Sequence, residues 1–183
     1  MTAEIYRAIE KRISDKVEEV KQIDWFMDQY AASIEDGMVW ITPTVFLEFM
    51  PVTWQQIGQN IQSATMQVKV HFLTDNDYED QKSLMMTNHL QLNKRVHKAL
   101  QNWGCLLSYV EGYEALQGTG SDMILINNMT RVASESEHQL RQFVVTTQTY
   151  EAYVTDLSMD NAADDVVVSP VKLEVEIHKI HHF

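Results

Sequence analysis

The chain has 183 residues and a formal net charge of −12 at pH 7, a size that fits one domain with at most an appended arm. Hydrophobic residues make up 45% of it and charged residues 22%, so most of the chain should fold as a globular domain. No apolar run approaches the roughly 18 residues of a membrane-spanning helix. The first residues lack the basic start and apolar run of a signal peptide, so we expect a cytoplasmic protein.

The acidic charge argues against a protein that binds nucleic acid tightly, because phosphate binding needs a basic patch. It argues equally against an anionic membrane surface as a partner. An acidic surface remains compatible with DNA that passes close by without adhering, and equally with plain solubility.

The first segment is predicted to be an amphipathic helix. Its apolar residues recur at three- and four-residue steps: Ile5, Ile9, Ile13, Val17 and Val20. Residues 21–28 then place Ile23, Trp25 and Met27 on one side, which predicts a strand. Residues 30–39 are expected to form a loop.

Two further strands are predicted in the first half. Residues 43–50 are a short apolar run between two prolines, which indicates a buried strand. Residues 52–60 are expected to form a turn or hairpin tip. Residues 62–73 alternate, and so predict a half-buried strand that ends at an Asp-Asn-Asp break. Its inner residues are Met66, Val68, Val70 and Phe72, and its outer residues are Gln67, Lys69 and His71.

A second helix is predicted from Asp80 or Ser83 to Gly104. Its inner side is expected to carry Met86, Leu90, Val96, Leu100 and Trp103, with Lys94, Arg95 and Lys98 off that side. A loop over 111–121, a strand over 123–133, a polar break over 134–137 and a long strand over 139–157 follow. Part of the long strand is expected to face solvent or another subunit, because neither of its faces is strongly apolar beyond the middle.

The end of the chain alternates clearly after an acidic linker. Val171, Leu173, Val175 and Ile177 point one way, and the residues between them are polar. A strand with one apolar face must bury it, either on its own sheet or on the sheet edge of a neighbouring subunit or partner. We favour the neighbouring edge, because the linker is long enough to reach it.

Together these elements predict an α+β fold: a mainly antiparallel sheet with two helices packed on one face, plus a C-terminal strand on a linker. The expected divisions are a domain over 1–157, a linker over 158–170 and a strand or arm over 171–183.

No motif in the sequence points to chemistry. His89 and His97 lie too far apart for the i, i+4 pair of a helical zinc site, and Cys105 has the apolar surroundings of an inert thiol. Histidines 178, 181 and 182 could bind a metal only adventitiously. The acidic loop over 75–80 is better explained as a solvated turn than as a cation site. We therefore predict no enzyme, no catalytic residue, no cofactor and no metal.

One tryptophan is a candidate interface residue. Trp54 follows Pro51 in the expected turn, where its ring would be exposed to a partner. The apolar residues of the C-terminal strand, namely Val171, Leu173, Val175 and Ile177, complete the predicted interface.

The order of these features resembles the small tail-terminator and tail-completion proteins of long-tailed bacteriophages. The likeness covers residues 1–157 and rests on element order and scattered positions. The residues that carry it are Ile23-Asp24-Trp25 with Gln29, the run from Pro43 to Phe49, then Trp54, Gly58, Gln62 and the strand over 66–73. The strand over 171–180 departs from the shortest members of the family.

The resemblance implies a homo-oligomeric ring, commonly a hexamer, at the head-proximal end of the tail. Such a ring stops tail-tube polymerisation and joins the tail to the neck. The implied partners are other copies of the chain, the tail-tube protein and a neck or head-completion protein, and the implied location is the virion. A head-completion or neck adaptor protein is the alternative. A small enzyme or ligand-binding domain is a third hypothesis, which would need a pocket with converging polar groups.

Overall fold

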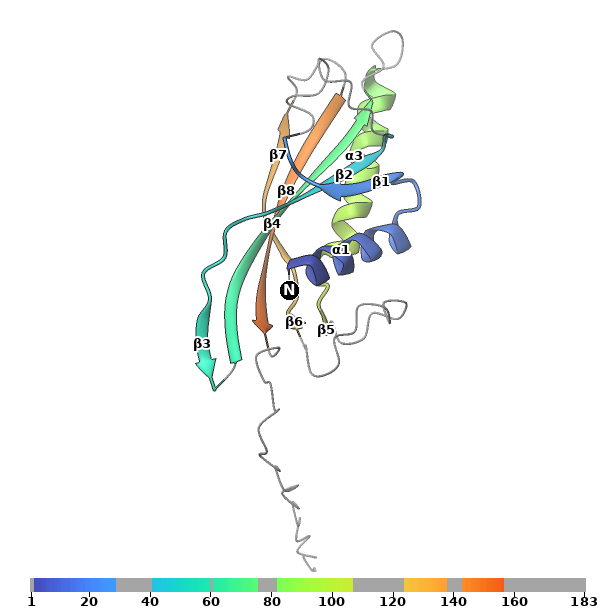
Figure 1. The fold of residues 1–183 in the computed structure, drawn as a ribbon. Coiled ribbons are helices and arrows are strands. Elements are labelled where there is room, and N and C mark those ends of the chain that lie inside the picture. Colours follow the sequence, from blue (N-terminus) through green and yellow to red (C-terminus); the bar gives the residue numbers. More distant parts are fainter. Residues whose placement is uncertain are drawn as a thin grey trace, which may run out of the picture.

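The computed structural model describes residues 2–28, 41–59, 61–75, 82–106, 124–137 and 143–156. These residues form an α+β fold with two helices and one curled, mixed sheet (Figure 1). The helices are α1 (Thr2–Lys16) and α3 (Lys82–Leu100). The strands are β1 (Gln22–Trp25), β2 (Thr44–Phe49), β3 (Gln55–Gly58), β4 (Ile61–Asp75), β5 (Cys105–Leu106), β6 (Ile124–Ile126), β7 (Thr130–Glu137) and β8 (Phe143–Asp156).

The sheet is built on a long ribbon of β4 and β8. These two strands pair antiparallel from Gln62 opposite Asp156 to Asp75 opposite Phe143. At one end of the ribbon β2 pairs with β4 and β7 with β8; at the other end β3 pairs with β4 and β6 with β8. Of the described pairings only β1 with β2 is parallel, so the predicted mainly antiparallel sheet is confirmed for this part of the chain.

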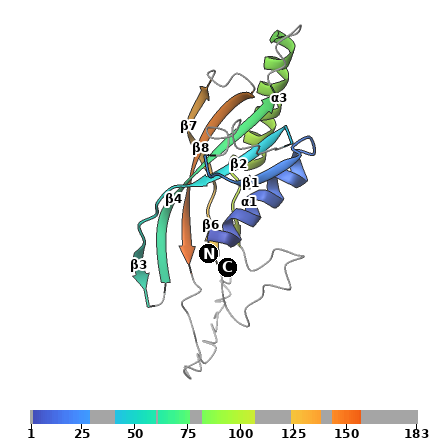
Figure 2. The same ribbon diagram turned by 45° about the horizontal axis from the view of Figure 1, so that its top comes forward.

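Both helices lie on the same side of the ribbon (Figure 1, Figure 2). The isoleucines of α1, at positions 5, 9 and 13, are at most 1% exposed, because an i, i+4, i+8 spacing puts them on one helical stripe. They join one core with Val45 and Leu47 of β2 and with the inward residues of β4 and β8. Each such buried side chain stabilises the fold by roughly 1.5–3 kcal/mol.

One arginine ties the two helices together. Arg12 of α1 donates from Nε to the carbonyl oxygen of Ala99, at 2.9 Å, and its guanidinium lies over the ring of Trp103. The bond satisfies a carbonyl near the end of α3, where helix carbonyls lack partners within the helix. The ends of the two helices are therefore joined by a polar contact beside the apolar core.

The opposite face of the sheet carries a smaller apolar cluster. Phe46, Leu73 and Val145 are buried there, and Phe26 and Phe143 pack against them. The alternation of β2, β4 and β8 explains both clusters, because successive side chains of a strand point to opposite faces.

Several sequence predictions are wrong in detail. Leu90 was expected on the inner side of α3 but is 50% exposed, and His89 and Asn93 are buried there instead, one turn apart. Met27 is 73% exposed, because β1 ends at Trp25. His71, predicted on the polar side of its strand, is buried.

The predicted strand over 123–133 is in fact two strands. β6 ends at Ile126, the chain continues through Asn127 and Asn128 without strand pairing, and β7 begins at Thr130. The predicted polar break over 134–137 belongs to β7, where alternating serine and glutamate residues pair with β8. The expected loops over 30–39 and 111–121 and the C-terminal strand lie outside the described residues.

Candidate protein interface

Two shallow hollows lie on the sheet face that points away from the helices. One has a volume of about 390 Å³ and the other of about 470 Å³, and both are lined by Thr65 and Tyr153. Tyr153 is 43% exposed and forms a wall common to the two. Asn127, Asn128 and Thr130 line the first hollow, and the chain between Met50 and Ile57 lines much of the second.

The chemistry of the hollows suits a protein contact better than a reaction. Their polar groups are mainly hydroxyls and amides, and Glu151, the carboxylate in the first hollow, accepts a hydrogen bond from Gln67 Nε2 at 3.1 Å. Catalysis would need titratable groups that converge on one point. Within the described ranges, no group of three or more His, Cys, Asp or Glu residues is placed to hold a metal ion.

A carboxylate, a histidine and a hydroxyl do meet elsewhere on this face. His71 Nε2 lies 3.0 Å from Glu48 Oε2, and His71 Nδ1 lies 3.1 Å from Thr147 Oγ1. Lys69 approaches the same carboxylate at 3.4 Å, and the ring of Phe26 stacks on the imidazole at 4.2 Å between centroids.

This order of groups is that of a hydrolytic triad, but the surroundings do not suit catalysis. A triad needs an accessible nucleophile and donors for an oxyanion. His71 is only 5% exposed, and neither hollow is lined by these residues. We interpret Glu48, His71 and Thr147 as a link across β2, β4 and β8 that satisfies a buried imidazole.

A second polar set joins α3 to the sheet from the helix side. His89 Nδ1 lies 2.8 Å from Thr74 Oγ1, and His89 Nε2 lies 2.7 Å from Thr146 Oγ1. Further along the helix, Asn93 Oδ1 accepts a bond from Gln148 Nε2 at 2.7 Å. These side chains fix the rotation of α3 on the sheet, because each polar group can bond in only one orientation of the helix.

Burial controls the charge states of this set. It lowers the pKa of His89 to about 4 and raises the pKa of the Tyr150 hydroxyl. It also lowers the pKa of His97, with a smaller contribution from the charge of Arg131. Tyr150 donates to Gln148 Oε1 and lies 3.1 Å from His97 Nδ1. The set is therefore neutral near pH 7 and serves packing.

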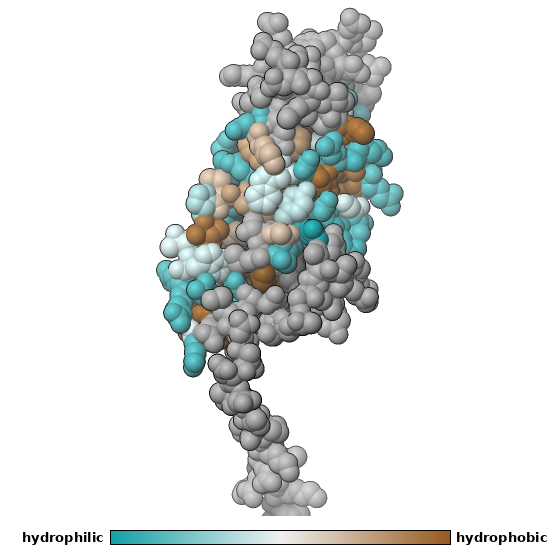
Figure 3. Space-filling view, viewed as in Figure 1, coloured by the Kyte–Doolittle hydropathy of each residue, from teal (hydrophilic) through white to brown (hydrophobic). Residues whose placement is uncertain are grey.

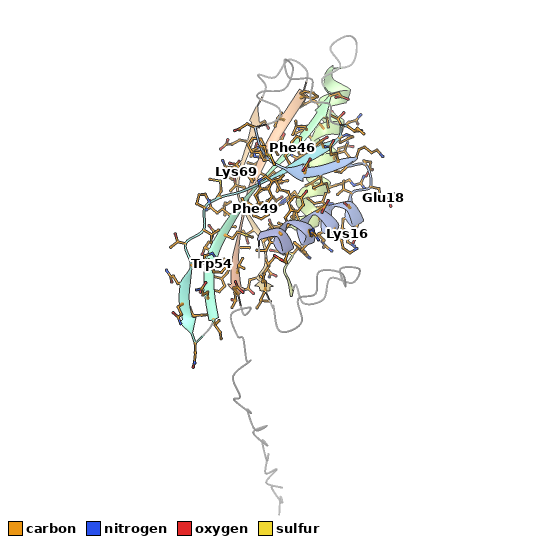
Figure 4. All side chains as sticks on the ribbon, in the orientation of Figure 1. Lys16, Glu18, Phe46, Phe49, Trp54 and Lys69 are labelled. Atoms are coloured by element: carbon orange, nitrogen blue, oxygen red, sulfur yellow. The ribbon has the colours of Figure 1, made fainter. Side chains whose placement is uncertain are left out.

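Of the predicted interface residues, the structure describes Trp54 but not those of the C-terminal strand. Trp54 is partly buried and packs against the main core beside the start of β3 (Figure 4). Less of its ring is therefore accessible to a partner than we predicted from its place in an expected turn. Val171, Leu173, Val175 and Ile177 lie outside the described residues.

The remaining candidate groups are placed only in part. Cys105 starts β5, but its side chain lies outside what the structure describes, as do histidines 178, 181 and 182. Asp75, at the start of the predicted acidic loop, accepts a hydrogen bond from the Thr42 hydroxyl.

Exposed apolar side chains are spread over the surface. Met27 and Ile41 are the most exposed among the described residues, followed by Ile57 in β3, Val132 in β7 and Leu90 in α3. In Figure 3 the hydrophobic residues form separate patches among hydrophilic ones. Sequence alternation did not indicate the hollows, because they arise where chain segments before β3 and after β6 border the ribbon.

No family model matches the chain. No curated protein matches it either. Among the described residues, no helix is long and apolar enough to cross a membrane.

Proposed function

We propose that this chain is a structural subunit of a phage tail, a tail-terminator or tail-completion protein that assembles into a homo-oligomeric ring. The observation that carries the proposal is the order of its elements. A helix and a short strand come first, and β2 begins directly after Pro43. The hairpin of β3 and β4 holds Gly58 and Gln62, and α3 is the next element that the structure describes. This is the order on which the resemblance rests.

The shape of the sheet supports assembly into a ring. Among the described strands, β3 pairs only with β4 and β7 only with β8, so they lie on opposite sides of the ribbon. Ile57 in β3 is 57% exposed and Val132 in β7 is 51% exposed. A closed ring needs two different surfaces on each subunit, and two open edges provide them.

The acidic charge supports a position around passing DNA. A ring with an excess of carboxylates repels the phosphates of the duplex and leaves the channel free. In the proposed assembly the partners are other copies of the chain, the tail-tube protein and a neck protein. Trp54 and the apolar side of residues 171–177 are the proposed contacts.

Electron microscopy of the purified protein and of phage that lack its gene tests the proposal. We expect closed rings in the first sample and tail tubes of uncontrolled length in the second. Tails of normal length that fail to join heads would instead indicate the head-completion or neck adaptor alternative. Particles that never contain the protein would refute a virion role.

A further inference from the structure

The outer face of α3 has a charge unlike that of the rest of the chain. The helix holds four of the 14 Lys and Arg residues and none of the 26 Asp and Glu residues. Lys94 and Lys98 are exposed, and Leu90, one turn before Lys94, is 50% exposed. Because four-residue steps share one side of a helix, these three side chains line a single strip.

An ordinary solvated helix face does not explain this strip. Solvated helices usually place carboxylates three or four residues from their lysines, where opposite charges attract. Lys94 has Lys98 at that spacing, so the two like charges repel. Arg95 differs, because it pairs with Glu19. The helix dipole favours Lys98 in the last turn, but its effect does not extend to Lys94 or to an exposed leucine.

We propose that this strip, defined as Leu90, Gln91, Lys94 and Lys98, docks on an acidic surface of a second copy of the chain. Charge complementarity argues for that partner. Since α3 holds no carboxylate, the acid excess of every copy lies outside this helix. A basic strip on one copy thus faces a complementary surface on the next, as a head-to-tail contact requires. The choice of a second copy rests on the proposed ring.

A protein surface fits the strip better than DNA does. The ammonium groups of Lys94 and Lys98 form no ion pair among the described residues, but two positive charges are a small patch for binding a DNA backbone. The net charge of −12 also repels phosphate groups. Leu90 would gain nothing from a phosphate backbone, whereas it can be buried at the centre of a protein contact.

A charge reversal on the full chain tests this inference. Sedimentation velocity over a range of concentrations would compare the wild type with Lys94→Glu/Lys98→Glu, at low and high salt. We expect the wild type to self-associate, more weakly at high salt, and the variant to associate at least about tenfold more weakly. The matched control is Lys16→Glu/Lys21→Glu, which changes the net charge equally at two exposed lysines that are not part of the strip.

Each outcome decides the question. Equal association of wild type and variant, equal weakening in the control, or a wild type that stays monomeric throughout would overturn the inference. So would binding of a fluorescent DNA duplex that depends on Lys94 and Lys98. The variant must still unfold cooperatively and close to the melting temperature of the wild type, because both lysines are exposed and Lys98→Glu changes only the small dipole interaction of the last turn. If the protein forms rings in virions but its association does not depend on the strip, only this inference is refuted. If the association depends on the strip but virions never contain the protein, only the proposed function is refuted.

Discussion

Replacing His89 by leucine should destabilise the fold strongly. His89 is 1% exposed and bonds Thr74 and Thr146 through its two ring nitrogens. The substitution removes both bonds, each with a net value of about 1 kcal/mol, and leaves the Thr146 hydroxyl buried without its partner, which costs about 1–3 kcal/mol more. We expect a loss of about 3–5 kcal/mol in the free energy of unfolding, measured by chemical denaturation. Asn88→Leu, on the exposed side of the same turn, is the control.

A double-mutant cycle tests the reason for that loss. Thr146→Val removes the hydroxyl that His89→Leu leaves unpaired, so the double variant should be less destabilised than the sum of the two single variants. Additive effects, or a loss from His89→Leu below about 0.5 kcal/mol, would show that this bond contributes little to the fold.

The same histidine predicts how stability depends on pH. Its pKa is about 4 in the folded protein and about 6.5 in the unfolded chain. Below pH 6.5 the unfolded chain therefore binds a proton that the folded protein excludes. The stabilisation is present above about pH 6.5 and is lost as the pH falls toward 4, by at most about 3 kcal/mol. His89→Leu should remove this part of the dependence, and identical pH profiles would contradict the reasoning.

Three further predictions concern packing, the C-terminal strand and DNA. Gly104→Ala should lower the free energy of unfolding by about 1–3 kcal/mol, because a Cβ atom there would lie 2.6 Å from a backbone oxygen of β6. Gly58→Ala is the control and should cost less, because its Cβ atom would meet only a side chain, at 3.4 Å. Replacing both Leu173 and Val175 by glutamate should impair ring assembly, seen by electron microscopy, more than it lowers the melting temperature. Normal rings from a chain truncated at Ser158 would exclude a role of the C-terminal strand in assembly. Duplex DNA should show negligible binding in an anisotropy titration at physiological salt, and micromolar, salt-sensitive affinity would contradict an acidic channel.

Apolar periodicity was enough to predict the elements whose buried sides are apolar throughout. Examples are the isoleucines of α1 and the apolar residues of β4 at positions 66, 68, 70 and 72, all of which are buried as expected. β8, over Phe143–Asp156, lies within the strand predicted over 139–157. In such elements each residue faces the core or solvent according to its own hydrophobicity, so local sequence carries the information.

Buried polar side chains explain the failures. His89 and Asn93 occupy the inner side of α3 because Thr146 and Gln148 of β8 bond them. Those partners are distant in sequence, and no local pattern reveals them. His71 is buried for the same reason, through Glu48 and Thr147. Because the bonds cancel the cost of burying polar groups, the rule that polar residues face water fails at these positions.

The hollows around Tyr153 could not be predicted either. They depend on where the chain before β3 and after β6 lies against the ribbon, and both segments are short and irregular. The sequence placed Trp54 in this region as an exposed ring, while the structure packs it partly into the core and leaves Tyr153 more open.

The ribbon of β4 and β8 has a consequence for how the chain reaches its folded state. Its two strands lie on either side of α3 in the sequence, so none of their pairs can form as a local hairpin. Contacts between distant residues slow folding, typically to milliseconds or seconds. During synthesis β4 emerges long before β8, and its apolar side chains and unpaired backbone then lack their main partner. Newly made chains should therefore depend on chaperones or on low temperature to avoid aggregation, until the last strand of the ribbon leaves the ribosome.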